Sequence, residues 1–234
     1  MKNIFICGES YIGYTVHIKG ADTMATSGYF ENVGWLRAAL EAFPDTAEKL
    51  DRYDLVILSD VGANTLMMTK KSFRESLPAP DRCKALRAYV ERGGALVMVG
   101  GFMSFTGIEG KARYGVTPIA DVLPVRLLPT DDRVETSEGS VPVILRKEHP
   151  IFQGLPDPWP HYFIGYNRTI ADAERGEVLA TINGDPFVAV GKFGEGRSVA
   201  FTSDCAPHWA PPSFLSSPDY GKLWKNIADW ATQP

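Results

Sequence analysis

Two segments of the sequence carry the residue types that nucleophilic catalysis uses. Asp204, Cys205 and His208 lie within five positions of one another, shortly after an apolar run, and Ser104 lies in a glycine-containing loop. A hydroxyl or thiol nucleophile needs a neighbouring base, and a third group must orient that base. Ser104 or Cys205, together with His208 and Asp204, supplies these types. A hydrolase or transferase is therefore one hypothesis for this chain.

The same residues also have structural interpretations. No Gly-x-Ser-x-Gly turn surrounds Ser104, and the sequence around Cys205 does not show the electropositive setting that a reactive thiolate needs. Small cysteines are commonly buried, so Cys205, Cys7 and Cys83 are equally compatible with the core. A histidine between proline and tryptophan, such as His208, also suits a hydrogen-bonded structural role.

Apolar runs and helical spacings predict the elements that position these residues. Ala95–Val99 is small or apolar at every position, which is typical of a strand covered on both faces. Leu55–Leu58 and Asn3–Cys7 have the same character. Helical spacing predicts helices over Asp81–Arg92 and Tyr220–Ala231. Strands alternating with helices predict an α/β fold with a mostly parallel central sheet.

Each of these strands is followed by a polar loop that contains glycine. The carboxyl ends of parallel strands meet at one edge of a sheet, where ligands bind. Glycines leave room for a ligand beside the main chain, while Lys111 and Arg113 add charge suited to a carboxylate or phosphate. We therefore expect a pocket for a small polar metabolite, lined by Glu9, Ser10, Asp60, Asn64, Gly100, Gly101, Phe102 and Arg113.

The C-terminal half of the chain predicts antiparallel strands. Glu177–Ile182, Pro186–Lys192 and Ser198–Thr202 alternate or run apolar, and the turns at 183–185 and 194–196 contain glycine. Such spacing is typical of hairpins. An antiparallel extension is therefore expected to follow the parallel half.

Composition limits the class of protein. The chain has 234 residues, of which 44% are hydrophobic and 22% are charged, so a single domain over residues 1–234 is expected. A formal net charge of -4 without a lysine or arginine block argues against a nucleic-acid or anionic-membrane partner. Three cysteines without metal-ligand spacing argue against disulfides and a metal site, and no cofactor is expected. The acidic segment Asp131–Glu135 is interpreted as a solvated loop.

The start of the sequence bears on its location. Met1 and Lys2 lead directly into the first predicted strand, and no long uncharged apolar run follows. Neither a signal peptide nor a membrane span is indicated. A cytoplasmic, soluble protein is therefore expected.

Several segments together resemble a family described as putative glutamine amidotransferases, a group of uncharacterised bacterial proteins. They are Ser59–Leu66, Gly93–Val125, Asp131–Glu135, His149–Pro156 and Gly196–Trp209. The family is similar to the class I glutamine amidotransferase-like superfamily, near the ThuA-like proteins. The resemblance covers most of the chain in the same order. It implies a three-layer α/β/α, flavodoxin-like sandwich.

The resemblance also implies what an active member would contain. Active glutaminases of that superfamily carry a cysteine at the elbow after the strand that corresponds to Leu96–Val99, and a late histidine followed by a glutamate. Here the elbow at 100–104 reads GGFMS, and His208 is followed by Trp209 and Ala210. Without the thiolate no acyl-enzyme forms, so glutaminase activity is not expected. A further strand before Phe43 is also implied, although the predicted helix Phe30–Ala42 leads almost directly into that residue.

Three functions stay open on the sequence. The first is a non-catalytic domain that binds a small polar metabolite at the strand ends. The second is a hydrolase or transferase that uses Ser104 or Cys205 with His208. The third is a structural subunit of a homo-oligomer, with exposed aromatic residues at its interface. The sequence does not decide whether the chain is an enzyme.

Overall fold

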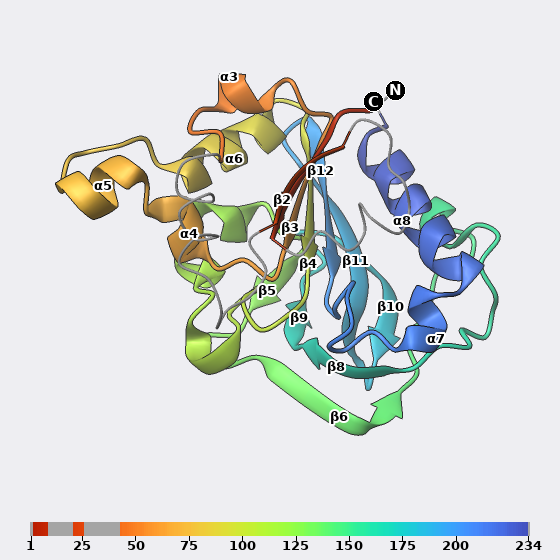
Figure 1. The fold of residues 1–234 in the computed structure, drawn as a ribbon. Helices are drawn as coiled ribbons and strands as arrows, with labels where there is room; N and C mark the ends of the chain where they lie inside the picture. The colour runs from red at the N-terminus through yellow and green to blue at the C-terminus, as the bar shows by residue number, and fades with distance from the viewer. Residues whose placement is uncertain (1, 9–20, 26–42, 234) are drawn as a thin grey trace.

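The computed structural model describes residues 2–8, 21–25 and 43–233 of the chain (Figure 1). The site candidates Glu9 and Ser10 lie outside the described residues. So does the helix predicted over Phe30–Ala42.

An eight-stranded sheet forms the middle layer, in the order β2-β1-β3-β4-β12-β11-β10-β7. The first five strands in this order are parallel, and the remaining three continue antiparallel. A mostly parallel sheet with an antiparallel C-terminal extension is therefore confirmed. The bounds are β2 Ala21–Ala25, β1 Ile4–Gly8, β3 Leu55–Ser59, β4 Ala95–Val99, β12 Gly196–Phe201, β11 Asp185–Phe193, β10 Glu177–Ile182 and β7 Val143–Ile144.

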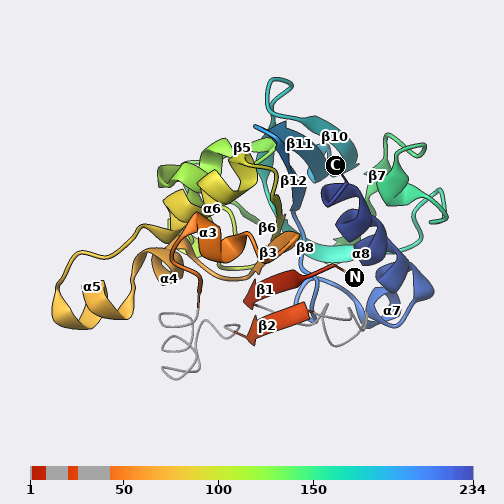
Figure 2. The same cartoon turned by 90° about the horizontal axis from the view of Figure 1, so that it is seen from above.

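Helices cover both faces of this sheet (Figures 1 and 2). Helices α3 (Ala47–Leu50) and α6 (Arg82–Glu91) lie on one face, while α7 (Pro212–Leu215) and α8 (Pro218–Ala231) lie on the other. The result is the three-layer α/β/α arrangement that the resemblance implied. Two further helices, α4 (Ala63–Met67) and α5 (Lys70–Glu75), follow β3.

The central strands are buried on both sides because their side chains alternate between two cores. Every residue of β1, β3 and β4 is buried. In β4, Leu96 and Met98 pack in the core that contains Leu86 of α6, whereas Val97 and Val99 pack in the core that contains Leu223 and Trp224 of α8. A strand with two apolar faces needs a helix on each side, which explains the layered order.

Two smaller antiparallel pairs lie outside the main sheet. Strand β5 (Val125–Leu127) pairs with β9 (Thr169–Ala171), and β6 (Arg133–Ser140) pairs with β8 (Phe163–Asn167). The pair of β6 and β8 runs across the lower end of the sheet in Figure 1. Short 3-10 helices complete the chain: η1 Ile108–Gly110, η2 Tyr114–Val116, η3 Pro118–Asp121 and η4 Pro150–Phe152.

The N-terminal edge of the sheet differs from the sequence expectation. Strand β2 pairs in parallel with β1 and occupies the edge. No apolar run or alternation at Ala21–Ala25 predicts this strand. The strand that the resemblance implied before Phe43 would fall at residues outside those that the structure describes. None of the helices that the structure describes is both long and apolar enough to cross a membrane.

Gly100→Ala tests the close approach of β4 to β12. A Cβ atom at Gly100 would lie 2.2 Å from the carbonyl oxygen of Thr202, so backbone must shift to admit it. We expect the variant to lose at least about 2 kcal/mol of unfolding free energy, measured by urea denaturation. Gly221→Ala in α8 is the control, because nothing lies within 4 Å of its added Cβ. It should gain up to about 1 kcal/mol, and equal effects at both positions would contradict the packing described.

Candidate functional site

The predicted convergence of strand ends is present in the structure. Strands β3, β4 and β12 are neighbours and parallel, with Ser59 opposite Val99 and Phe201 opposite Val99. The loops that contain Gly62, Gly101 and Asp204 therefore leave the sheet at one edge. Side chains far apart in the sequence are brought together there.

Ser104 holds two of these loops together. Its hydroxyl donates a hydrogen bond to the carbonyl oxygen of Val99 at 2.5 Å and accepts one from the backbone N–H of Asp60 at 3.1 Å. The Asp60 carboxylate in turn accepts from the backbone N–H of Met103 at 2.6 Å. Ser104 is also buried, at 2% exposure. Its hydroxyl is hydrogen-bonded to the main chain rather than to a histidine, so no base is placed to activate it as a nucleophile.

Cys205 has a similarly structural environment. Its sulfur lies 3.3 Å from the hydroxyl oxygen of Ser59, and the residue is fully buried. Cys7 and Cys83 are free and buried as well, as one of the sequence interpretations proposed. Burial raises the pKa of Cys83 to about 12, so its thiol stays protonated.

Asp204 and His208 form the hydrogen-bonded pair that the sequence suggested. The Asp204 carboxylate lies 3.2 Å from Nδ1 of His208 and also accepts from the backbone N–H of Ala206. Burial raises the pKa of Asp204, while the bond from His208 acts in the opposite direction. If Nδ1 donates to the carboxylate, Nε2 keeps its lone pair and can accept a proton or a hydrogen bond.

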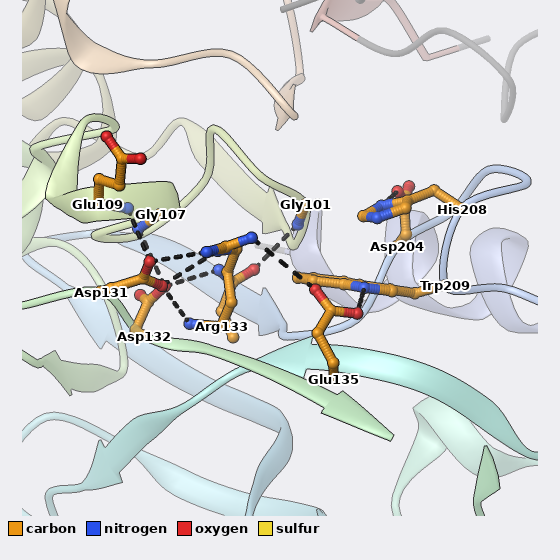
Figure 3. A network of polar contacts seen from close by, with 11 residues as sticks. Gly101, Gly107, Glu109, Asp131, Asp132, Arg133, Glu135, Asp204, His208 and Trp209 are labelled. Atoms are coloured by element: carbon orange, nitrogen blue, oxygen red, sulfur yellow. Dashed lines mark hydrogen bonds and ion pairs between the residues drawn. The ribbon is translucent and has the colours of Figure 1, made fainter. Parts of the chain in front are cut away.

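Aromatic rings fix the orientation of His208. Its ring stacks on Trp209 at 4.7 Å between centroids and meets the Phe102 ring edge to face at 4.3 Å. The His208 side chain remains 35% exposed. A buried carboxylate therefore holds a partly exposed imidazole in one orientation at the edge of the sheet (Figure 3).

The interpretation of Asp131–Glu135 as a solvated loop was wrong for Asp132, which is buried, and for Arg133–Glu135, which belong to β6, whereas Asp131 and Glu135 are exposed as expected. Asp132 is buried, and its carboxylate accepts from the backbone N–H groups of Thr106 and Gly107 at 2.8 and 2.9 Å. The Asn167 side chain donates to the same carboxylate at 2.8 Å. Desolvation raises the pKa of Asp132 to about 6, although its three donors oppose that shift.

Asp132 is buried because the glycine-containing loop after β4 supplies backbone donors for its carboxylate. Gly107 has φ +74, a conformation favoured by glycine, and the N–H groups around it point to one place. Such a nest binds anions. Asp132 occupies it, and Asp131 accepts from the N–H of Glu109 beside it (Figure 3). Lys111, one of the two cations expected to bind an anionic ligand, forms a salt bridge with Glu109 instead.

Residues of β6 extend the site beyond the sequence prediction. The guanidinium of Arg133 binds the Asp131 carboxylate with two nitrogens and lies 4.9 Å from the Phe102 ring centroid. Glu135 accepts from the indole N–H of Trp209 at 3.0 Å. We call this group the His208 cluster: Phe102, Arg133, Glu135, Asp204, His208 and Trp209. One sequence signal points to Arg133 and Glu135. They flank the apolar Val134, and this polar–apolar alternation is typical of a strand that places both charged side chains on one face.

The remaining predicted residues fall at different places. Gly101 donates its N–H to the side-chain oxygen of Asn167, so it belongs to the Asp132 network. Asn64 lies in the first turn of α4. Arg113 lines a separate cavity that includes none of the other predicted ligand residues. Among the residues that the structure describes, no group of three His, Cys, Asp or Glu side chains is placed to hold a metal ion.

Comparison with known proteins identifies relatives of the chain. A family model described as "Putative glutamine amidotransferase" matches residues 37–233. The solved structure of Cytoplasmic Protein STM3548 from Salmonella typhimurium is 33% identical, with a TM-score of 0.88 and 99% of each chain covered. Cytoplasmic Protein STM1381 from Salmonella typhimurium LT2 is 34% identical, with a TM-score of 0.88 and 100% of each chain covered.

A more distant structure shares the fold. A thua-like protein from Parabacteroides merdae ATCC 43184 is 13% identical, with a TM-score of 0.59, and the match covers 100% of this chain and 90% of that one. At this identity the likeness concerns the fold alone. Among curated proteins, none matches the chain. The family and the α/β fold that the resembling segments indicated are therefore confirmed.

Asp132→Asn tests the buried network. At about pH 4 we expect the variant to be less stable than the wild type, because an amide nitrogen cannot accept from the Thr106 or Gly107 N–H. The measurement is the free energy of unfolding in urea. Equal stability of the two proteins would show that the three hydrogen bonds contribute nothing.

The same pair of proteins gives a pH dependence with a defined sign. The folded pKa of Asp132, about 6, lies above its ordinary value of 3.8, so the unfolded chain releases this proton first. The stability that the carboxyl contributes is full below about pH 4 and is lost as the pH rises through about 6. The stability gap between wild type and Asp132→Asn should therefore shrink, by at most about 3 kcal/mol, between about pH 4 and pH 7. A gap that is constant or widens would contradict the raised pKa.

Proposed function

This chain belongs to the family described as putative glutamine amidotransferases, and from that premise we propose that it is a cytoplasmic protein without glutaminase activity that binds a small polar metabolite at the His208 cluster. The proposal has two parts, and each is supported by particular side chains. The first part concerns the missing nucleophile. The second concerns the ligand.

The elbow after β4 supports the absence of glutaminase activity. Residues 100–104 contain no cysteine, and Ser104 in that loop has its hydroxyl hydrogen-bonded to the main chain. Cys205 follows β12 instead, fully buried beside Ser59. A thiol at that place cannot meet a substrate without the opening of the core. The usual acyl-enzyme therefore lacks its nucleophile.

The Asp204–His208 pair is the observation that carries the binding proposal. A buried carboxylate orients the imidazole, and the two flanking rings prevent its rotation. With Nδ1 donating to the Asp204 carboxylate, Nε2 is a hydrogen-bond acceptor at the edge of the sheet, where ligands of α/β proteins bind. Phe102 is only partly buried and offers ring surface beside it.

Local charge favours a neutral or cationic ligand. Asp60 and Glu135 each keep exposed surface near the strand ends, and their carboxylates attract cations. The cation of the cluster, Arg133, is bound to Asp131 by two nitrogens. An anionic ligand would compete with that carboxylate. A ligand rich in hydroxyl or amino groups fits these side chains better.

Hydrolysis is the second candidate, and the same pair favours it. An imidazole oriented by a carboxylate is the base of many hydrolases. Because Ser104 and Cys205 are both engaged elsewhere, His208 would have to activate water rather than either side chain. This modifies the hypothesis drawn from the sequence, which used Ser104 or Cys205 as nucleophile.

Absence of a glutaminase nucleophile is tested with the glutamine analogue 6-diazo-5-oxo-norleucine, which alkylates reactive active-site cysteines. We expect intact-protein mass spectrometry to find no adduct on the native protein, because all three cysteines are buried. For the same reason, an ammonia assay with glutamine as substrate should detect no release of ammonia. Denatured protein treated with iodoacetamide is the control, and it should carry three labels. An adduct on native Cys205 that needs His208 would overturn this part of the proposal.

Ligand charge is tested on one sugar scaffold. We expect glucosamine and glucose to bind more tightly than glucuronate, because the Asp60 and Glu135 carboxylates keep exposed surface near the strand ends. Binding is followed by NMR through the amide signals of Phe102 and His208. His208→Gln should abolish the response, whereas His149→Gln, at the start of η4, should leave it unchanged. Tighter binding of glucuronate, or no response to any of the three sugars, would contradict the proposal.

A further inference from the structure

A cavity lies apart from the His208 cluster. It has a volume of ≈ 330 Å³, at the lower end of the range of about 300–1,000 Å³ for small-molecule sites. Its walls come from the loop before and within η2 and from the end of β5. The lining includes Thr106, Arg113, Val116, Leu127, Leu128 and Pro129. No member of the His208 cluster lines it.

Arg113 is the charged group of this cavity. Neighbouring charges are paired with one another: Lys111 with Glu109, and Arg126 with Asp172. Arg113 takes part in no salt bridge with the residues that the structure describes. Its guanidinium is therefore a cation available to a ligand at the wall of the cavity.

The other walls are mainly apolar. Val116 is 76% exposed, which leaves most of its side chain open to contact, and Leu127 and Leu128 are only partly buried. The hydroxyl of Thr106 donates to the carbonyl oxygen of Leu128, so its hydrogen is used within the protein. The cavity thus combines one cation with apolar surface.

We propose that this cavity binds an organic monocarboxylate with a short aliphatic or aromatic body. A guanidinium binds a carboxylate with two parallel hydrogen bonds, and one cation matches one negative charge. The apolar body would lie against Val116, Leu127 and Pro129 and remove their surfaces from water. This site is independent of the proposed function, because it uses a different ligand charge and different residues.

Backbone geometry keeps Arg113 in place. Its φ of +62 lies in the left-handed region, which costs a residue with a Cβ atom about 1 kcal/mol or more. Hydrogen bonds from the N–H of Ala112 to Thr106 and from the N–H of Tyr114 to Phe105 flank the residue and hold this conformation. The backbone that carries the Arg113 side chain is therefore held in place at the wall of the cavity.

The experiment is an NMR titration of the full chain with hexanoate, hexanamide and inorganic phosphate. We expect hexanoate to shift the amide signals of Gly110, Arg113 and Val116 in a saturable way. Hexanamide, which has the same apolar body without the charge, should bind at least about tenfold more weakly. Phosphate, which lacks an apolar body, should produce no saturable shift. Preference for phosphate would mean that the site is a simple anion site and would overturn the proposal.

Matched variants assign the binding to Arg113. Arg113→Gln should abolish the response to hexanoate, whereas Arg126→Gln should bind as the wild type does, because Arg126 is exposed on β5 but does not line the cavity. Hexanoate binding that survives Arg113→Gln, or the absence of any saturable shift up to about 50 mM, would overturn the proposal. The amide signals of Phe102 and His208 should stay in place throughout, so failure here and failure of the proposed function are distinguishable.

Discussion

The buried carboxylate of Asp132 is the constraint on which the site depends. Removing a carboxylate from water is costly unless donors replace the lost hydration. The donors here come from the loop after β4, through Thr106 and Gly107, and from β8, through Asn167. Asn167 also accepts from the N–H of Gly101. One charge therefore joins the end of β4, the glycine-containing loop and the ribbon of β6 and β8.

This junction explains the arrangement of the His208 cluster. Asp132 immediately precedes β6, so anchoring it brings Arg133 to the Phe102 ring and Glu135 to the Trp209 indole. Strand β12 brings Asp204 and His208 to the same edge, because it lies next to β4 in the sheet. The cluster thus combines residues from β6 and from the loops that follow β4 and β12. Its geometry follows from one buried, hydrogen-bonded carboxyl group and from the order of the strands.

The same contact changes the electrostatics of the glycine-containing loop. Backbone N–H groups that would otherwise bind an external anion are occupied by Asp131 and Asp132. Arg133 of the His208 cluster is paired with Asp131, whereas Arg113 takes part in no salt bridge with the described residues and lines a separate cavity. Our two proposals therefore assign opposite ligand charges to two places that the sequence had combined in one pocket.

Local patterns were enough to predict an α/β fold with a mostly parallel sheet, and the family resemblance implied its three layers, whereas long-range contacts decided the site. Strands β1, β3, β4 and β10, helices α6 and α8, and the Asp204–His208 pair follow from apolar periodicity or from spacings of a few residues, because those depend on neighbours in the chain. Ser104 accepts from the N–H of Asp60, 44 residues away, and Cys205 contacts Ser59, 146 residues away. The donors to the Asp132 carboxylate lie 25, 26 and 35 residues away. A carboxylate is buried or solvated according to the donors that tertiary packing brings to it. The tertiary structure alone therefore placed Asp132 in the interior and made Ser104 and Cys205 structural.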